Sequence, residues 1–156
     1  MEKLSTMLWF DSEAERAAEH YVRAVSGSKI VDVQRYGKQG PGVEDTAMLV
    51  NIELAGRPMM LLNGGPLFTP NESVSFALYC DDQKEGDFLW AHMGEGGKFS
   101  QCGWLKDRWG FSWQIIPRRF SELMRTSPAD AKGRVFGAMM QMQKFDIAKL
   151  EAAAKG

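Results

Sequence analysis

The apolar residues in the first third of the chain change their spacing in a regular order. Residues 5–10 predict a strand, and residues 13–25 carry apolar side chains at helical spacing. Asp11 or Ser12 is expected to cap this helix, because short polar side chains accept hydrogen bonds from the free N–H groups of a first turn. Three more strands are predicted, with a loop rich in Gly and Pro after the first of them: residues 29–36, 47–54 and 58–62.

The next part of the chain repeats this order of elements. Residues 73–80 predict a strand, and residues 83–93 predict a helix with Phe88 turned inward. Leu8–Asp11 aligns with Leu78–Asp81, so the second set looks like a copy of the first. We therefore predict an α+β fold of paired βαβββ modules followed by C-terminal helices, all within one domain, in the segments 1–66, 67–118 and 119–156.

A tryptophan-rich stretch, residues 100–117, closes the second module. Its aromatic residues flank a polar turn that contains Asp107 and Arg108, and this pattern predicts a β-hairpin. We expect Asp107 and Arg108 to form a solvated pair in the turn. Gln114 interrupts the apolar strand that follows, and faces either water or a concave pocket.

The C-terminal segment predicts two or three amphipathic helices. In the longest, residues 128–142, apolar side chains spread around much of the helix: Val135, Phe136, Met139, Met140 and Met142. Two apolar faces indicate two surfaces to cover, one in the same subunit and one in a partner, so we predict a homodimer. The alternative is a tail that buries both faces within one subunit.

Charge and composition exclude several classes of partner. The 156 residues carry a formal net charge of −1 without a basic stripe, which argues against nucleic acid. No apolar run is long enough to cross a bilayer, so no membrane partner is predicted. Cys80 and Cys102 are the only cysteines, which favours a reducing cytoplasm and inert thiols, with a catalytic thiol as the alternative.

Five stretches together resemble one known family. They are LWFDSEAERAAEHYV, LLNGGP, SFALYCDD, SQCGWLKDRWGFSWQIIP and AMMQMQKFDIAKLEAA. On these stretches the chain is similar to the PhnB-like family, often labelled 3-demethylubiquinone-9 3-methyltransferase. That family belongs to the vicinal oxygen chelate superfamily of glyoxalases, bleomycin-resistance proteins and dioxygenases. The resemblance implies the glyoxalase/bleomycin-resistance-like fold, in which each module forms half of a cupped sheet around a cavity.

The resemblance also implies where a divalent metal would bind in superfamily enzymes. Carried over by the internal repeat, the ligand positions hold Ser5, Met60, Ser75 and Gln114. Hydroxyl, thioether and amide groups are poor ligands for such ions, which prefer carboxylate or imidazole, so we predict no metal. His20 and His92 fall on the predicted helices, outside the cup.

Strand alternation then predicts the lining of the cavity. The lining consists of Ser5, Met7, Trp9, Met60, Ser75, Tyr79, Ser112 and Gln114. Aromatic walls with a few polar groups are typical of a cleft for a small molecule. The same residues would equally fill the core between two packed sheets, and the sequence leaves both interpretations open.

Three functions follow from this lining. We favour a metal-free protein that binds an unidentified aromatic or amphipathic small molecule and uses no cofactor. The alternative is a metal-dependent lyase, isomerase or dioxygenase with other ligands. A methyltransferase comes third, because the sequence has no Gly-rich loop between a strand and a helix of a βαβ unit. The sequence has no Ser-His-Asp or Cys-His arrangement, so no catalytic residue is named.

Overall fold

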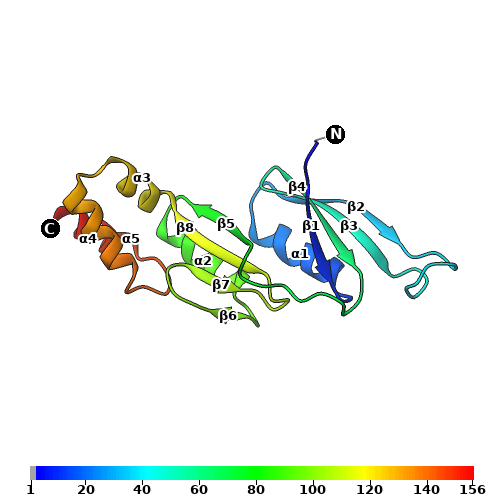
Figure 1. Ribbon diagram of the computed structural model, residues 1–156. Helices are drawn as coiled ribbons and strands as arrows, with labels where there is room; N and C mark the ends of the chain where they lie inside the picture. Colours follow the sequence, from blue (N-terminus) through cyan, green and yellow to red (C-terminus); the bar gives the residue numbers. More distant parts are fainter. Residues whose placement is uncertain (1–2) are drawn as a thin grey trace. The chain divides into compact units, whose positions relative to one another are not determined.

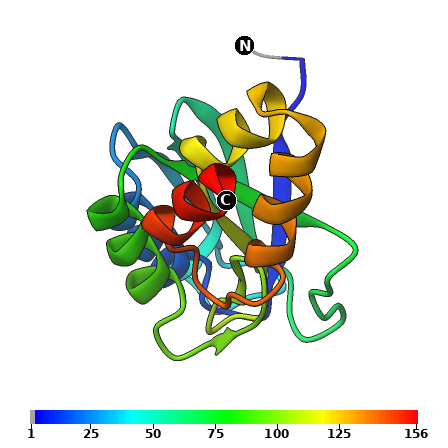
Figure 2. The same ribbon diagram turned by 90° about the vertical axis from the view of Figure 1, so that its left-hand side faces the viewer.

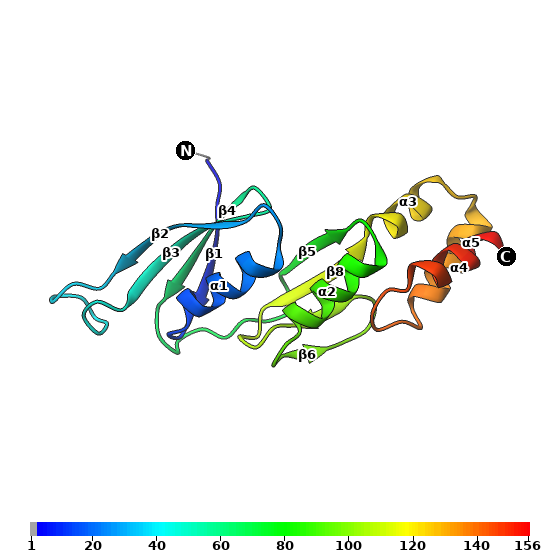
Figure 3. The same ribbon diagram turned by 180° about the vertical axis from the view of Figure 1, so that it is seen from behind.

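The computed structural model describes residues 3–156 and divides into two units, which meet between Pro70 and Asn71 in the sequence. The first unit is a four-stranded sheet with one helix on one face (Figures 1 and 3). The strand order is β1-β4-β3-β2, with β1 parallel to β4 and the other pairs antiparallel. Its elements are β1 (Thr6–Phe10), α1 (Ala14–Ala24), β2 (Lys29–Arg35), β3 (Ala47–Leu54) and β4 (Arg57–Asn63).

Small side chains let α1 lie close to this sheet. Ala14, Ala17 and Ala18 are fully buried, together with Tyr21. The sheet meets them with one face of alternate residues, which are Leu8, Phe10, Val50, Ile52, Leu54, Met59 and Leu61. Burial of such apolar side chains contributes about 1.5–3 kcal/mol each, so this face holds the first unit together.

Asn63, at the end of β4, joins three elements of the first unit. Its Oδ1 accepts a hydrogen bond from the N–H of Ala14 at 2.8 Å, and its Nδ2 donates to the carbonyl of Ala47 at 2.9 Å. The predicted cap at Asp11 or Ser12 is wrong, because the N-cap residue of α1 is Glu13 and it makes no side-chain cap hydrogen bond. The helix is capped from a distant strand instead.

Replacing Asn63 with alanine should lower the free energy of unfolding by about 2 kcal/mol, because a buried N–H and a buried carbonyl both lose their partner. Urea denaturation followed by circular dichroism measures the change. Ser12→Ala is the matched control, and it should cost less than about 0.5 kcal/mol because Ser12 is exposed. Equal losses in the two variants would contradict the role of Asn63.

The second unit contains the same βαβββ order, so the predicted pair of modules is confirmed. Its strand order is β5-β8-β7-β6, with β5 parallel to β8, and α2 covers one face. The elements are β5 (Ser75–Cys80), α2 (Gln83–Met93), β6 (Lys98–Phe99), β7 (Trp104–Lys106) and β8 (Ser112–Pro117). Trp113, Leu105 and Met93 are almost fully buried between α2 and the sheet. Phe88 points outward with 50% of its surface exposed, contrary to the prediction.

The C-terminal segment forms three helices, of which α4 and α5 pack side by side (Figure 2). They are α3 (Arg118–Thr126), α4 (Ala129–Met139) and α5 (Ile147–Lys155). A core of their own holds them together: Leu123, Val135, Met139, Met142, Phe145 and Leu150. None of the helices formed by residues 3–156 has the length and apolar character needed to cross a bilayer.

Hydrogen bonds from the Gln83 side chain on α2 and from two backbone N–H groups attach this tail to the rest of the second unit. Gln83 donates from Nε2 to the carbonyl of Phe145 at 3.1 Å and accepts at Oε1 from the N–H of Ile147 at 2.9 Å. The N–H groups of Cys102 and Gly103 donate to the carbonyls of Met142 and Gln143, each at 2.7 Å. The tail is therefore an integral part of the second unit.

Candidate functional site

Each sheet has a second face that no helix of its own unit covers, which we call its open face. In the first unit, Met7 lies beside Met60 and Trp9 lies beside Leu62 across the parallel β1–β4 pair. Met7 is 50% exposed, and Trp9 and Met60 are half-buried. Three of the eight predicted site residues therefore come together on one apolar open face.

Ser5 lies just before β1 and is not free to act as a ligand of a bound group. Its Oγ donates to the carbonyl of Pro58 at 3.0 Å. Ser5 therefore lies beside Pro58, which is two residues before Met60 on β4. The hydroxyl fastens the start of β1 to β4.

The open face of the second sheet is more polar. Ser75 lies beside Ser112, and Gln114 lies between Ala77 of β5 and Trp104 of β7. The Nε2 of Gln114 donates to the Oγ of Ser75 at 2.9 Å. Four predicted residues, Ser75, Tyr79, Ser112 and Gln114, thus lie on adjoining strands β5 and β8.

Two of these residues differ greatly in accessibility. Tyr79 is 47% exposed. The guanidinium of Arg118 lies over its ring, with the Cζ atom 5.4 Å from the ring centroid. Ser112 is only 2% exposed, and its Oγ has no hydrogen-bond partner among the described residues. Tyr79, on the edge strand β5, is therefore accessible to a ligand, whereas Ser112 is buried.

The donor set at the implied metal positions does not fit a divalent ion. Ser5 is bonded to a backbone carbonyl, Gln114 directs its amide nitrogen at Ser75, and Met60 contributes a thioether. Hard and borderline cations prefer anionic oxygen or imidazole. Within residues 3–156, no group of three or more His, Cys, Asp and Glu side chains is placed to hold a metal. His20 and His92 lie on α1 and α2.

Asp107 has a role that the sequence analysis missed. Its Oδ1 accepts from the N–H groups of Trp109 and Phe111 at 2.9 and 3.0 Å, and its Oδ2 accepts from the indole Nε1 of Trp113 at 2.8 Å. Asp107 is 3% exposed, whereas Arg108 pairs with Glu95 at 2.9 Å. The predicted solvated pair is wrong, because the carboxylate turns inward to organise the β7–β8 connection.

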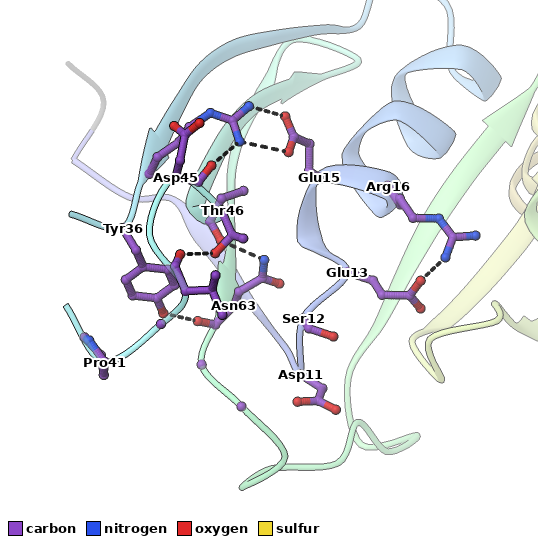
Figure 4. A pocket seen from close by; sticks show the side chains of 16 residues that line it. Asp11, Ser12, Glu13, Glu15, Arg16, Tyr36, Pro41, Asp45, Thr46 and Asn63 are labelled. Carbon is purple, nitrogen blue, oxygen red and sulfur yellow. Dashed lines mark hydrogen bonds and ion pairs between the residues drawn. The ribbon is translucent and has the colours of Figure 1, made fainter. Parts of the chain in front are cut away.

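A cavity of about 600 Å³ opens at one end of the first sheet (Figure 4). Its walls are the β1–α1 turn, the loop between β2 and β3, and the stretch from Asn63 to Gly65. Arg35 donates to Glu15 at 2.9 Å and to the carbonyl of Asp45 at 3.0 Å, and the Tyr36 hydroxyl donates to the carbonyl of Asn63 at 2.6 Å. The eight predicted site residues lie elsewhere, and these polar groups already bind one another.

The two cysteines are free, and they differ in environment. Cys80 is buried, and this burial, assisted by the nearby Glu85 carboxylate, raises the pKa of its thiol to about 11. Because the thiolate is the reactive form, iodoacetamide at pH 8 should alkylate the half-buried Cys102 well before Cys80. Mass spectrometry of tryptic peptides measures the order, and urea-unfolded protein, in which both react, is the control. Faster labelling of Cys80 in the native protein would contradict the prediction.

Comparison with known proteins decides the family. A family model described as 3-demethylubiquinone-9 3-methyltransferase matches residues 2–116. The chain belongs to this family. The family lies in the vicinal oxygen chelate superfamily, as the resemblance of the sequence indicated. No curated protein matches the chain.

Solved structures show the same fold as this family member. The PhnB protein of Bacillus cereus is 28% identical, with a TM-score of 0.68, and the match covers 74% of this chain and 99% of that one. Protein PA1353 of Pseudomonas aeruginosa is 18% identical, with a TM-score of 0.63 and coverage of 75% and 98%. A protein of Bacillus cereus described as a possible glyoxalase is 11% identical, with a TM-score of 0.51 and coverage of 74% and 98%.

The tail lies outside the part that defines the family. The family model ends at residue 116, two residues before α3 begins at Arg118. The sequence analysis included the stretch AMMQMQKFDIAKLEAA in the resemblance, and the family model does not extend to it. The PhnB protein is covered over 99% of its length while this chain is covered over 74%. The three C-terminal helices therefore lie outside the residues that the family model matches.

Proposed function

We propose that this family member binds small molecules without a metal, and that each sheet offers a binding surface on its own open face. The observation that carries the proposal is the hydrogen bond from Gln114 to Ser75. The resemblance implies metal ligands at these two positions, and an amide and a hydroxyl that bind each other are poor ligands for a divalent ion. Neutral hydrogen-bonding groups flanked by Trp104 and Tyr79 suit an uncharged polar group on an aromatic or amphipathic ligand.

The first unit supports the same proposal with a different surface. Met7, Met60 and Trp9 form an apolar area on its open face, and Met7 alone leaves half of its surface in water. Methionine side chains adapt to ligands of irregular shape because they are flexible and polarisable. The open face of the first unit would therefore offer mainly apolar contact to a ligand.

The methyltransferase activity named in the family description has less support in this chain. The turns that lead into α1 and α2 carry Asp11 and Ser12 in one module and Asp81 and Asp82 in the other. A nucleotide-type cofactor site of a doubly wound fold needs a Gly-rich loop at such a turn. We therefore propose binding as the function rather than methyl transfer.

A fragment screen on ¹⁵N-labelled protein tests the proposal. Fragments that bind should shift the side-chain amide signals of Gln114 and the indole signal of Trp104, with the same affinity in the presence of EDTA. Gln114→Leu should weaken binding of these fragments about tenfold, because a buried hydrogen bond is worth about 1 kcal/mol or more. Gln101→Leu, on an exposed residue, is the matched control. Binding that appears only after a divalent metal is added would overturn the proposal.

We further propose that α4 takes part in a homodimer. Val135 and Met139 are buried in the tail, whereas Phe136 on α4 and Met140, the C-cap residue of that helix, are 49% and 50% exposed. This second apolar stripe is the surface that a partner would cover.

Sedimentation at micromolar concentration should show twice the 17.5 kDa mass of one chain. The double variant Phe136→Glu, Met140→Glu should sediment as one chain, because a charge in an apolar contact is costly. Phe88→Glu, a change at another half-exposed aromatic residue, should leave the dimer intact. A wild-type monomer, or a double variant that still dimerises, would contradict the proposed interface.

A further inference from the structure

An aromatic corner stands on the open face of the first unit. The side chain of Phe68, in the stretch that follows β4, meets the indole of Trp9 on β1. The ring centroids are 5.0 Å apart and the ring planes make an angle of 78°. Two rings at nearly a right angle leave a corner in which a third ring can stack on one and place its edge against the other.

The indole half of the corner is fixed in place. The Nε1 of Trp9 donates to the carbonyl of Gly65 at 2.8 Å. A Cβ atom on Gly64 would lie 2.2 Å from the Trp9 ring, so only glycine allows the indole to lie against the backbone there. Because the indole N–H is already bonded, Trp9 can offer a ligand only its apolar ring surface.

The phenyl half of the corner is held out into water. Phe68 is 60% exposed, which is unusual for so large an apolar side chain. Pro66 and Pro70 stand two residues before it and two residues after it. Proline restricts the backbone, so the exposed position of Phe68 costs little further entropy when a ligand binds.

We propose that the Trp9–Phe68 corner is a binding subsite for a planar aromatic group of the ligand. The inference rests on the proposed function, because it names the class of ligand that the open face takes. Phe68 lies outside the strand positions that the superfamily pattern implies, so this subsite adds a contact from the connecting stretch. A rigid corner without a free hydrogen-bonding atom favours a flat apolar ring over a polar or puckered one.

A pair of compounds with the same skeleton tests the inference. The probes are 2-naphthol, which is planar, and decahydro-2-naphthol, which is saturated and puckered. The readout is the indole N–H signal of Trp9, assigned by its loss in Trp9→Phe. 2-Naphthol should shift this signal saturably and bind about three- to tenfold more tightly than the saturated compound, as expected for an aromatic pair worth about 0.5–1.5 kcal/mol.

Two variants in the connecting stretch then separate the corner from its surroundings. Phe68→Leu keeps an apolar side chain but removes the ring, and should weaken 2-naphthol about three- to tenfold while leaving decahydro-2-naphthol unchanged. Leu67→Ala is the matched control, since Leu67 is the neighbouring residue and is 72% exposed. This control should bind both compounds as the wild type does.

The outcomes distinguish the subsite from the proposed function. Equal affinity for both compounds, or equal weakening by the two variants, overturns the aromatic corner. If 2-naphthol shifts the signals of Gln114 and Trp104 but not that of Trp9, the proposed function stands and the corner fails. If Trp9 does not respond and Phe68→Leu changes the sedimenting mass, another part of the protein covers the corner and the inference is wrong.

Discussion

Replacing Asp107 with alanine is expected to lower the free energy of unfolding by about 3–5 kcal/mol. The buried carboxylate accepts hydrogen bonds from the N–H groups of Trp109 and Phe111 and from the indole of Trp113. Its removal leaves three N–H donors without an acceptor in a region from which water is excluded. Each buried donor without a partner costs about 1–3 kcal/mol. Urea denaturation followed by tryptophan fluorescence measures the loss.

Two further variants show which part of the carboxylate matters. Asp107→Asn keeps an acceptor for the two backbone N–H groups but turns an N–H group toward the Trp113 indole, so it should lose about 1–3 kcal/mol. Arg108→Ala is the control, because the Arg108–Glu95 ion pair lies near the surface and is worth about 1 kcal/mol or less. A loss from Arg108→Ala as large as that from Asp107→Ala would restore the solvated pair that the sequence suggested.

The second large effect is expected at Gly103, where the tail meets the β7–β8 hairpin. Gly103 has a φ of 79°, and its N–H donates to the carbonyl of Gln143. A Cβ atom there would lie 2.5 Å from the Phe145 ring and 2.7 Å from the carbonyl oxygen of Ile115. Gly103→Ala should therefore lower the free energy of unfolding by about 2–5 kcal/mol. Strain of the left-handed backbone accounts for about 1–2 kcal/mol and overpacking for about 1–3 kcal/mol.

Gly56 provides the control for strain alone. It has a φ of 77°, almost the same as Gly103, and a Cβ atom there would have no neighbour within 4 Å. Gly56→Ala should cost only about 1–2 kcal/mol, so the difference between the two variants measures the packing of the tail. Amide hydrogen exchange should show loss of protection in α4 and α5 for Gly103→Ala alone. If both variants lose the same free energy of unfolding and the same amide protection, the tail is not packed against Gly103.

Local pattern was enough to predict the modules. Both βαβββ units have the predicted order, and the predicted bounds of α2 are those of the structure. Alternation along β1 and β8 also placed Met7, Trp9 and Gln114 on the faces away from the helices. These features depend on the period of apolar residues, which a strand or helix repeats every two or 3.6 residues whatever the rest of the chain does.

The cap of α1 shows where local pattern fails. Asp11 and Ser12 have the right chemistry and the right position, yet the bond comes from Asn63, 49 residues from Ala14. The same limit applies to Phe68, because its contact with Trp9 depends on how the chain returns after β4. A preference for capping is worth about 1 kcal/mol, so tertiary packing readily replaces one cap with another.

The sequence by itself determined the order of strands and helices and the repeat of the module, because these depend on residues near one another in the chain. Only the tertiary structure decided which polar side chains are buried and what they bind. Asp107 and Asn63 look like surface residues of a turn and a strand end, and they become buried only when the strands assemble around them. A buried polar group must find a partner wherever the fold supplies one, and that partner is not encoded in local spacing.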